Sequence, residues 1–246
     1  ATKGDGTQHI LPSSHFPRKE TGAESVKVTP VVTDLATRRC EVTVEALVVD
    51  ADRVRFALDG QEMSAPVENG TAKAVFTLEN ARLWNGLDDP YLYTVTASLD
   101  NGETQSTRFG CRKFEIDPQK GFFLNGRFYP LRGVSRHQDR KGVGVAITKE
   151  MMEEDLALIL EMGANTIRLA HYQHAQAFYD LCDEKGLVIW AEIPYITMHM
   201  HNGRANTLTQ MEELIVQNYN HPCIAVWGLS NEITAASPVN EELLEN

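Results

Sequence analysis

Hydrophobic and polar residues alternate along residues 26–116 in a series of short segments. The period of two is the spacing of a β-strand with one buried face. The clearest apolar positions lie within residues 42–48, 54–58, 72–78 and 92–99. Turn dipeptides typical of β-hairpins separate the segments: Asp59-Gly60, Asn69-Gly70 and Asn101-Gly102. Six or seven short strands in this span predict an antiparallel, immunoglobulin-like β-sandwich.

The pattern changes after Asp117-Pro118. A hairpin turning on Asn125-Gly126 leads into short apolar runs that alternate with amphipathic helices. The predicted strands cover residues 131–135, 166–170, 187–193 and 224–229, and helices are predicted to start near Thr148, Ala175, Thr207 and Pro238. For the third of these, Thr207 and Gln210 form a predicted capping box. Four successive β-α units predict a parallel sheet with right-handed crossovers.

These patterns divide the chain into three parts and predict a multi-domain β plus α/β protein. Residues 1–24 lack periodicity and are interpreted as a linker or remnant. Residues 25–116 form the predicted sandwich, and residues 117–246 form the predicted α/β domain.

Polar side chains gather where the predicted parallel strands end. In chain order they are Arg136, His137 and Asp139, then Arg168 and His171, then Glu192, then Asn231 and Glu232. The carboxyl ends of parallel strands meet at one edge, where α/β proteins place their active sites. Guanidinium, imidazole and carboxyl groups at one edge suit a sugar site. We expect Glu232 to be half buried beside Trp227, to have a raised pKa and to act as a general acid.

Each of these residues also has a purely structural interpretation. Asn231 and Glu232 also fit the cap and first turn of a helix. Arg168 also fits a structural arginine paired with Glu192 or Asp139, a role compatible with a site. His171 on its own is an ordinary hydrogen-bonded histidine. His199 and His201 have a spacing that can bind a metal, although they lie in a loop containing Gly and Asn.

Several motifs resemble glycoside hydrolase family 2, which includes β-galactosidases, β-glucuronidases and β-mannosidases. The first is the segment Asn220-His221-Pro222, Trp227-Gly228 and Asn231-Glu232, which is similar to the family's acid/base signature. The others are Arg132-Gly133-Val134-Ser135-Arg136-His137, Asn165-Thr166-Ile167-Arg168 with His171-Tyr172, and Ala191-Glu192-Ile193-Pro194. Ser135, Leu169 and Gln173 depart from the usual pattern.

The resemblance implies a fold and a set of roles. Residues 117–246 would be the first half of a (β/α)8 TIM barrel that follows the sandwich. Glu232 would be the acid/base, and the resemblance places Asn231, His137, Asp139 and His171 against the sugar. Arg168 would orient the nucleophilic carboxylate, with Glu192 as a supporting carboxylate.

The family's nucleophile lies near the end of a seventh strand, and only four strands are predicted here. The resemblance therefore implies a fragment of a retaining β-glycosidase, with β-galactosides as the expected substrates, and the isolated chain is expected to be inactive. Some relatives bind magnesium after the third strand, but Ile196 and Met198 stand at those positions. No metal or cofactor is expected.

Charge and cysteine content restrict the partners. A net charge of −11 disfavours nucleic acid and anionic membranes, and no apolar run reaches the ~20 residues of a membrane helix. The four cysteines lack CxxC spacing and are predicted to be free, buried thiols. This favours a reducing, cytoplasmic compartment, while periplasmic and secreted locations stay open. The open edges and apolar inner face of a half barrel predict a homo-oligomer.

Two other function classes remain open. A non-catalytic module that binds carbohydrate or protein would show glycan binding without hydrolysis. A metal-dependent hydrolase would use His171, His199 and His201, and would lose activity to a chelator. A serine hydrolase has little support, because Gly228-Leu229-Ser230-Asn231-Glu232 lacks the second glycine of that motif.

Overall fold

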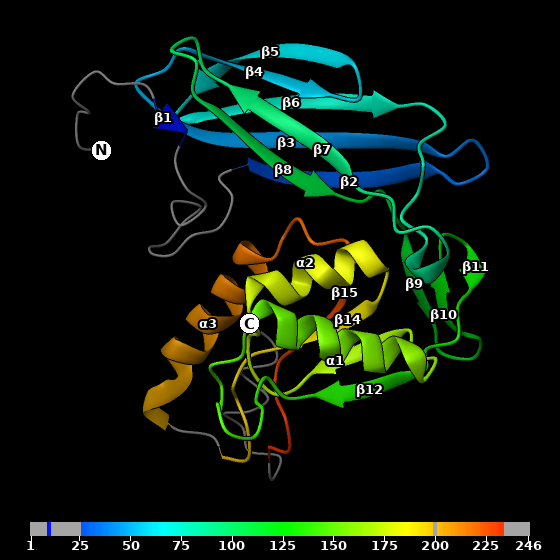
Figure 1. The fold of residues 1–246 in the computed structure, drawn as a ribbon. Helices are drawn as coiled ribbons and strands as arrows, with labels where there is room; N and C mark the ends of the chain where they lie inside the picture. The colour runs from blue at the N-terminus through cyan, green and yellow to red at the C-terminus, as the bar shows by residue number, and fades with distance from the viewer. Residues whose placement is uncertain (1–8, 11–25, 199–200, 234–246) are drawn as a thin grey trace. The chain divides into compact units, whose positions relative to one another are not determined.

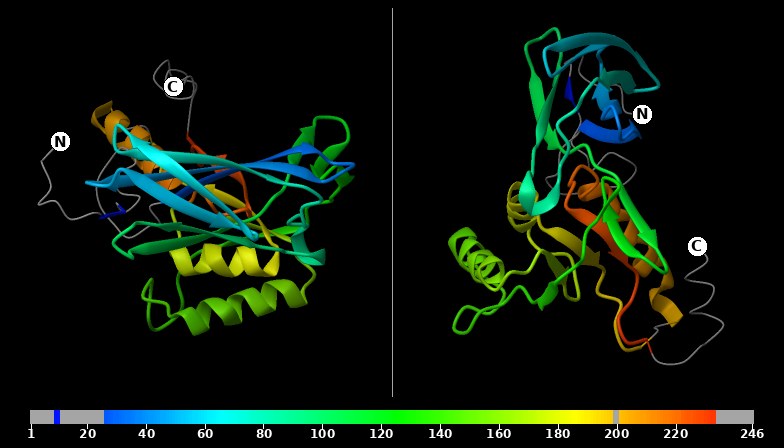
Figure 2. Two further views of the ribbon diagram at one scale, coloured as in Figure 1. Left: turned by 90° about the horizontal axis from the view of Figure 1, so that it is seen from above. Right: turned by 90° about the vertical axis from the view of Figure 1, so that its right-hand side faces the viewer.

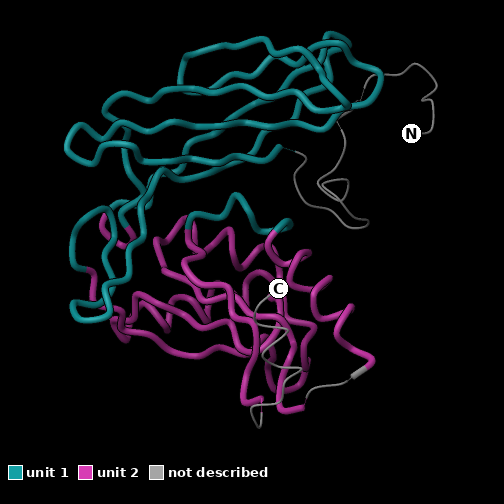
Figure 3. Tube along the Cα trace, turned by 180° about the vertical axis from the view of Figure 1, so that it is seen from behind, with its two compact units in different colours: residues 1–85, 89–128, 216–222 teal, residues 86–88, 129–215, 223–246 magenta. Residues whose placement is uncertain are grey.

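The computed structural model describes residues 9–10, 26–198 and 201–233, and these form two compact units (Figure 3). Unit 1 takes in residues 1–85, 89–128 and 216–222, and unit 2 takes in the rest. The boundary predicted after residue 116 stays a prediction. The predicted linker, residues 1–24, lies outside the described residues except for His9–Ile10, which form strand β1 and pair with β3.

Unit 1 is built on the predicted antiparallel strands (Figures 1 and 2). They are β2 (Val26–Asp34), β3 (Arg39–Val49), β4 (Arg53–Leu58), β5 (Gln61–Glu68), β6 (Thr71–Leu78), β7 (Tyr93–Ser98) and β8 (Thr104–Phe109). The pairing order is β1-β3-β6-β5-β4-β7-β8, with β2 beside β3. β5 pairs with β4 along its length and with β6 only at Val67 and Glu68, so it links the two layers of the sandwich.

Alternate side chains of these strands fill the core. In β3, Val42, Val44 and Ala46 are fully buried, while Thr43 and Glu45 between them are only partly buried. Trp84 is also fully buried, and its ring meets that of Phe114 edge-on with the centroids 6.2 Å apart. All four cysteines are buried and free, as the sequence predicts.

Strand β5 differs from the predicted pattern. Its sequence QEMSAPVE buries only Ala65, so no regular apolar alternation reveals it. The turns on either side do follow the prediction. In the first, φ is 49° at Asp59 and 75° at Gly60, and in the second it is 52° at Asn69 and 79° at Gly70. Both residues of a type I′ hairpin turn need such positive φ.

A three-stranded sheet completes unit 1. It contains β9 (Phe114–Asp117), β10 (Gly121–Leu124) and β11 (Arg127–Phe128) in the order β11-β10-β9. The predicted turn on Asn125-Gly126 is confirmed, with φ of 52° and 75°.

Unit 2 holds the predicted parallel sheet. Its strands β12 (Gly133–Arg136), β13 (Thr166–Leu169), β14 (Val188–Glu192) and β15 (Ile224–Gly228) pair in chain order. The helices are α1 (Lys149–Glu161), α2 (Gln176–Lys185) and α3 (Arg204–Gln217), with short 3-10 helices η2 (Gly86–Asp88) and η3 (His201–Gly203). This is the succession of β-α units expected for part of a TIM barrel. The helix predicted from Pro238 lies outside the described residues.

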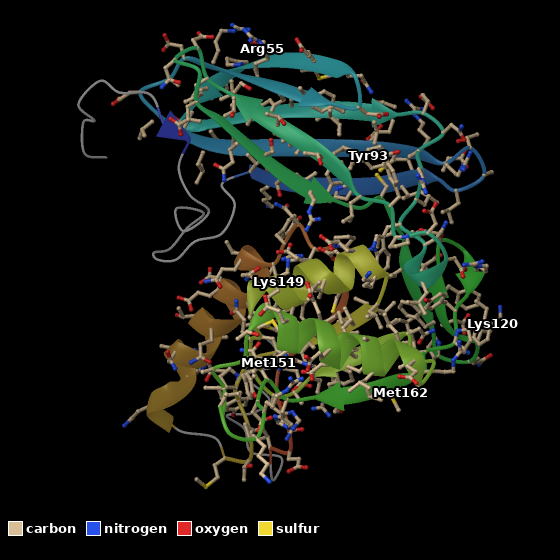
Figure 4. All side chains as sticks on the ribbon, in the orientation of Figure 1. Arg55, Tyr93, Lys120, Lys149, Met151 and Met162 are labelled. Atoms are coloured by element: carbon tan, nitrogen blue, oxygen red, sulfur yellow. The ribbon has the colours of Figure 1, made fainter. Side chains whose placement is uncertain are left out.

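Helix ends follow local sequence at α1 and α2 but not at α3. The Thr148 side chain accepts from Met151 N at the start of α1, and Met162 lies at the opposite end (Figure 4). The predicted start of α3 at Thr207 is wrong, because the helix begins at Arg204. The Thr207 hydroxyl donates to Gly203 O at 3.1 Å, a bond that a threonine inside a helix can make to the preceding turn. No helix among the described residues is both long and apolar enough to cross a membrane.

The parallel sheet has two different faces. Ile167, Leu169 and Ile189 are fully buried on the face covered by helices. Ser135, Arg168 and Trp190 share the other face, since they lie opposite one another in the ladder. That second face is more open, and Trp190 is 39% exposed. Side chains at its carboxyl end form the candidate site.

Candidate active site

Four of the predicted residues meet in one cluster at the carboxyl end of the sheet. Arg168 Nε donates to Glu192 Oε1, and Arg168 Nη2 donates to Asn231 Oδ1 at 2.9 Å. His171 Nδ1 lies 2.8 Å from Glu192 Oε2. Arg168 therefore pairs with Glu192, one of the two partners considered from sequence. The cluster joins residues from β13, β14 and the segment after β15.

Glu192 is the centre of this cluster. Glu192 is 1% exposed. One of its carboxylate oxygens accepts a hydrogen bond from Arg168, and the other accepts one from His171. The space for it comes from Gly228, which lies opposite Glu192 in the ladder. A Cβ at Gly228 would lie 2.6 Å from Glu192 Cγ and would also collide with the Trp190 indole. Packing against Glu192 and Trp190 therefore explains why the residue after Trp227 is a glycine.

The hydrogen bond to Glu192 fixes the state of the His171 ring. A carboxylate oxygen can only accept, so Nδ1 of His171 carries the proton. The contact of 3.5 Å between His171 Nδ1 and Arg168 Nη2 is then a near approach of two donors. In the neutral ring Nε2 keeps its lone pair, and this leaves an acceptor for a hydroxyl group.

Main-chain bonds hold Asn231 against Arg168. Asn231 N donates to Tyr195 O at 2.9 Å, and Thr197 N donates to Asn231 O at 3.0 Å. These bonds form a parallel bridge between Ile196 and Asn231. The helix-cap interpretation of Asn231 does not describe this arrangement, since its side-chain oxygen accepts from a guanidinium group.

His137 lies next to the cluster, whereas Asp139 does not join it. The His137 and His171 rings meet edge-on, with their centroids 5.3 Å apart. Asp139 is exposed, and its carboxylate makes no hydrogen bond or ion pair with another described residue. The structure therefore gathers the two imidazoles and leaves Asp139 outside.

The predicted half-buried position of Glu232 is wrong, because the residue is exposed. It lies beyond the end of β15 and follows Asn231, which is turned toward Arg168. Its φ of 51° is a left-handed conformation, so the chain turns here and the carboxylate does not follow the Asn231 side chain into the cluster. Within the part of the chain that the structure describes, its carboxylate has no hydrogen-bond or ionic partner.

The Asn220-His221-Pro222 part of the signature belongs to unit 1. Asn220 Oδ1 accepts from Val28 N at 2.8 Å, and Asn220 Nδ2 donates to Val26 O at 2.7 Å. Asn220 therefore satisfies main-chain groups of β2. Its place in the motif has a structural explanation.

Sequence reasoning missed two residues behind the site. Arg136 was expected at the rim, but it is buried and points toward the helices, where its guanidinium lies 4.0 Å from the centre of the Phe178 ring. His174, which was not singled out, is 3% exposed and lies 3.1 Å from Arg136 Nη1. Strand alternation was the available signal, since Gly133 and Ser135 share one face and Arg136 takes the other.

Ile196 and Met198 stand at the positions where some relatives bind magnesium, and their side chains are poor ligands for that ion. Ile196 supplies no ligand atom, and Met198 supplies only a thioether, which hard cations such as magnesium disfavour. Both side chains are exposed. The His199 and His201 side chains, considered as metal ligands, lie outside the described residues.

Comparison with protein families gives two adjoining matches. Residues 15–112 match the model described as glycosyl hydrolases family 2. Residues 114–243, more than half of the chain, match the model described as glycosyl hydrolases family 2, TIM barrel domain.

Individual relatives are β-glycosidases by name. The chain is 47% identical to a β-glucuronidase of Bacteroides fragilis over 169 residues, which are 63% of this chain and 24% of that protein. It is 31% identical to a β-galactosidase of Bacteroides ovatus over 194 residues, 71% of this chain and 23% of that protein. The chain thus spans about a quarter of the length of the curated relatives it matches.

Solved structures agree with these matches. The crystal structure of an FMN-binding β-glucuronidase from Facaelibacterium prausnitzii L2-6 is 40% identical, with a TM-score of 0.82, over 90% of this chain and 36% of that one. The apo structure of Bacteroides uniformis β-glucuronidase 3 is 30% identical, with a TM-score of 0.79, over 90% of this chain and 30% of that one. With its sandwich, its partial barrel and both family models matched in order, the chain belongs to glycoside hydrolase family 2.

Proposed function

We propose that this chain is the part of a retaining β-glycosidase that supplies the acid/base, Glu232, and part of the sugar-binding site. The observation that carries the proposal is the cluster of Arg168, His171, Glu192 and Asn231 at the carboxyl end of a parallel sheet. Asn231, a member of the cluster, immediately precedes Glu232 in the chain. Such a rim suits a sugar with several hydroxyl groups.

Each group has a proposed role. Glu232 gives a proton to the departing glycosidic oxygen and later takes one from water. Its exposure leaves the carboxyl group accessible to a substrate. Asn231 and the Nε2 atom of His171 meet sugar hydroxyls, with His137 beside them and Asp139 as an outer contact. Arg168, already bound to Asn231, orients the partner carboxylate.

The second carboxyl group of the reaction is proposed to come from outside this chain. Retaining glycosidases place two carboxyl groups about 5–5.5 Å apart. Glu192 is a poor nucleophile, because Arg168 and His171 occupy both of its oxygens and burial keeps it from substrate. Glu192 therefore supports the site, and the isolated 246-residue chain is proposed to be inactive.

The proposed substrates are terminal β-linked sugars, with β-glucuronides first. The names of the relatives that are 47% and 41% identical favour glucuronides. β-Galactosides, the substrates expected from sequence, are the second candidate, since the 31% identical relative from Bacteroides ovatus is named a β-galactosidase.

The test uses the parent enzyme with a panel of aryl β-glucuronide, β-galactoside and β-mannoside substrates. We expect Glu232→Gln to lower kcat/KM by about 10²–10⁴-fold, the usual contribution of general acid–base catalysis. The loss should be smallest with a highly acidic phenol as leaving group, because that group departs without a proton. Glu212→Gln, at an exposed position on α3, is the matched control and should be without effect.

Two results would contradict the proposal. One is equal activity of the parent enzyme and its Glu232→Gln variant on every substrate in the panel. The other is hydrolysis by the purified 246-residue chain that Glu232→Gln abolishes, which would show that no outside carboxylate is needed.

A further inference from the structure

The two loops that present His137 and His171 are joined from behind by buried polar groups. The first loop lies between Arg136, the last residue of β12, and Arg140, and the loop after β13 runs from Ala170 to Ala175. Arg136, Asp155 and His174, here called the polar clamp, connect both loops to each other and to α1. None of these three residues belongs to the cluster around Glu192.

Asp155 holds both ends of the first loop. Arg136 Nε and Nη2 donate to Asp155 Oδ2 at 3.1 and 2.8 Å, while Arg140 Nη2 donates to Asp155 Oδ1 at 2.9 Å. Both oxygens of one carboxylate are therefore used, one at each end of the loop. The three residues between, including His137, are restricted to a short arc.

His174 joins this loop to the second one. A guanidinium group can only donate, so Arg136 Nη1, 3.1 Å from His174 Nδ1, donates to it. The proton of the neutral imidazole is then on Nε2, which donates to Ala170 O at 3.1 Å. Ala170 is the residue immediately before His171. The state of one buried ring thus links Arg136 to the peptide that carries His171.

Further bonds tie the same two loops together. Gln138 N donates to the Tyr172 hydroxyl at 3.0 Å, and Ala175 N donates to Gln138 Oε1 at 2.7 Å. Burial supports the arrangement, since Arg136 is 6% exposed and His174 is 3% exposed. In such surroundings a lost hydrogen bond is not replaced by water, so the geometry is strictly held.

We propose that Arg136 and His174 are positioning residues, which set the separation and orientation of the His137 and His171 rings. Neither residue touches the sugar. They act through the backbone that bears the two imidazoles, and Asp155 anchors them to α1. The consequence for sugar cleavage rests on the proposed function, while the positioning itself is a property of this chain.

The test compares two variants of His174 in the 246-residue chain by NMR at fixed neutral pH. Glutamine places an amide N–H near the position of Nε2 and keeps the donor to Ala170 O, whereas asparagine is one methylene shorter and loses it. We expect His174→Asn to shift the imidazole signals of His137 and His171 and to remove the cross-relaxation between the two rings. His174→Gln should retain both features. Cys182→Ala, a buried change on α2, the helix that follows His174, controls for general destabilisation.

Unchanged imidazole signals in a folded His174→Asn variant would overturn the proposal, as would equal shifts in the Asn, Gln and Cys182→Ala variants. If His174→Asn does not fold, Asp155→Asn decides instead, because the Asp155 side chain is 25% exposed and amide substitution keeps its shape. A folded Asp155→Asn variant should displace the His137 signal, and an unmoved signal would overturn the proposal. These readouts do not need enzymatic activity, so failure of the glycosidase proposal would be seen separately in the substrate panel.

Discussion

At the scale of single residues, the buried carboxylate of Glu192 dominates the energetics of the site. A carboxylate with this little exposure is stable only when charged or polar partners replace its water. Arg168 and His171 supply those partners, and Arg168 also lies 5.0 Å from the centre of the Trp190 ring. Removing Glu192 should therefore affect stability as well as the site.

We predict that Glu192→Ala lowers the free energy of unfolding by about 3 kcal/mol, as measured by urea unfolding. This is the lower end of the range for breaking a buried ion pair, because the Arg168 side chain keeps 31% exposure. Glu153→Ala is the control: its pair with Lys149 spans 3.8 Å at the surface, and we expect a change below about 0.5 kcal/mol. A loss for Glu192→Ala as small as that of the control would contradict the prediction.

Burial gives His174 an unusual pKa and a pH-dependent contribution to stability. Desolvation lowers the pKa of the His174 imidazole from 6.5 to about 4, and the nearby charges of Arg136 and His137 act in the same direction. The native state keeps the ring neutral, whereas the unfolded chain takes up a proton below pH 6.5. The contribution of the neutral His174 ring to the free energy of unfolding is therefore fully present above pH 6.5. It falls as the pH drops toward 4 and does not change further below that.

We predict that this residue costs the protein about 2 kcal/mol of stability between pH 6.5 and pH 4.5. The measurement is urea unfolding at both pH values, for the wild type and for His174→Gln, which cannot titrate. The variant should lose less stability than the wild type over this interval. The same loss in both proteins would show that His174 does not contribute.

At the scale of elements, the pairing of β14 with β15 depends on a residue without a side chain. Gly228 lies opposite Glu192, and the space that its Cβ would need is filled by the Glu192 and Trp190 side chains. Two large groups can therefore lie over one strand, and Glu192 can reach Arg168. The position of Glu192 in the site therefore depends on the sequence of β15 as well as on the residues that contact its carboxylate.

We predict that Gly228→Ala destabilises the protein by about 1–3 kcal/mol, the usual cost of overpacking. Part of this loss should be recovered by adding Trp190→Phe, because the colliding indole nitrogen is then absent. Urea unfolding of the two single variants and the double variant gives the coupling energy, which we expect to exceed about 0.5 kcal/mol. Strictly additive effects would argue against the contact.

At the scale of the whole molecule, the parallel sheet of unit 2 is open among the residues that the structure describes. Its outer strands are β12 and β15. Large apolar side chains are exposed on β14 and in the segments after β14 and β15: Trp190 (39%), Ile196 (41%) and Leu229 (39%). Unpaired edges and exposed apolar groups favour association with another chain.

We therefore predict that the purified chain self-associates, with an average mass in sedimentation that rises with concentration. Ile196→Asp should weaken the association, because it places a charge among the apolar groups, whereas Glu153→Ala should leave it unchanged. A single monomeric species at tens of micromolar, roughly the range in which weak contacts are visible, would contradict the prediction.

Much of the architecture could be read from local patterns. Asn125-Gly126 adopts the positive φ values that a tight hairpin needs, and the apolar runs at Ile167 and Ile189 are buried as predicted. β5 shows no apolar alternation, because its side chains are mostly polar, and only the turns on either side of it were predicted. Pairing with β4, and not apolar alternation, therefore places β5 in the sheet. The start of α3 was misplaced because Thr207 bonds to the preceding turn instead of capping.

The sequence by itself determined the order of strands and helices, the family, and the strand ends at which the polar residues stand, because periodicity and motif spacing are properties of the chain alone. Only the tertiary structure decided which of these side chains touch. It joined Arg168 to Glu192 and Asn231, left Asp139 and Glu232 exposed, and turned Arg136 toward His174. The reason is that strand pairing and helix packing select one partner among several that lie within reach, and no local pattern records that selection.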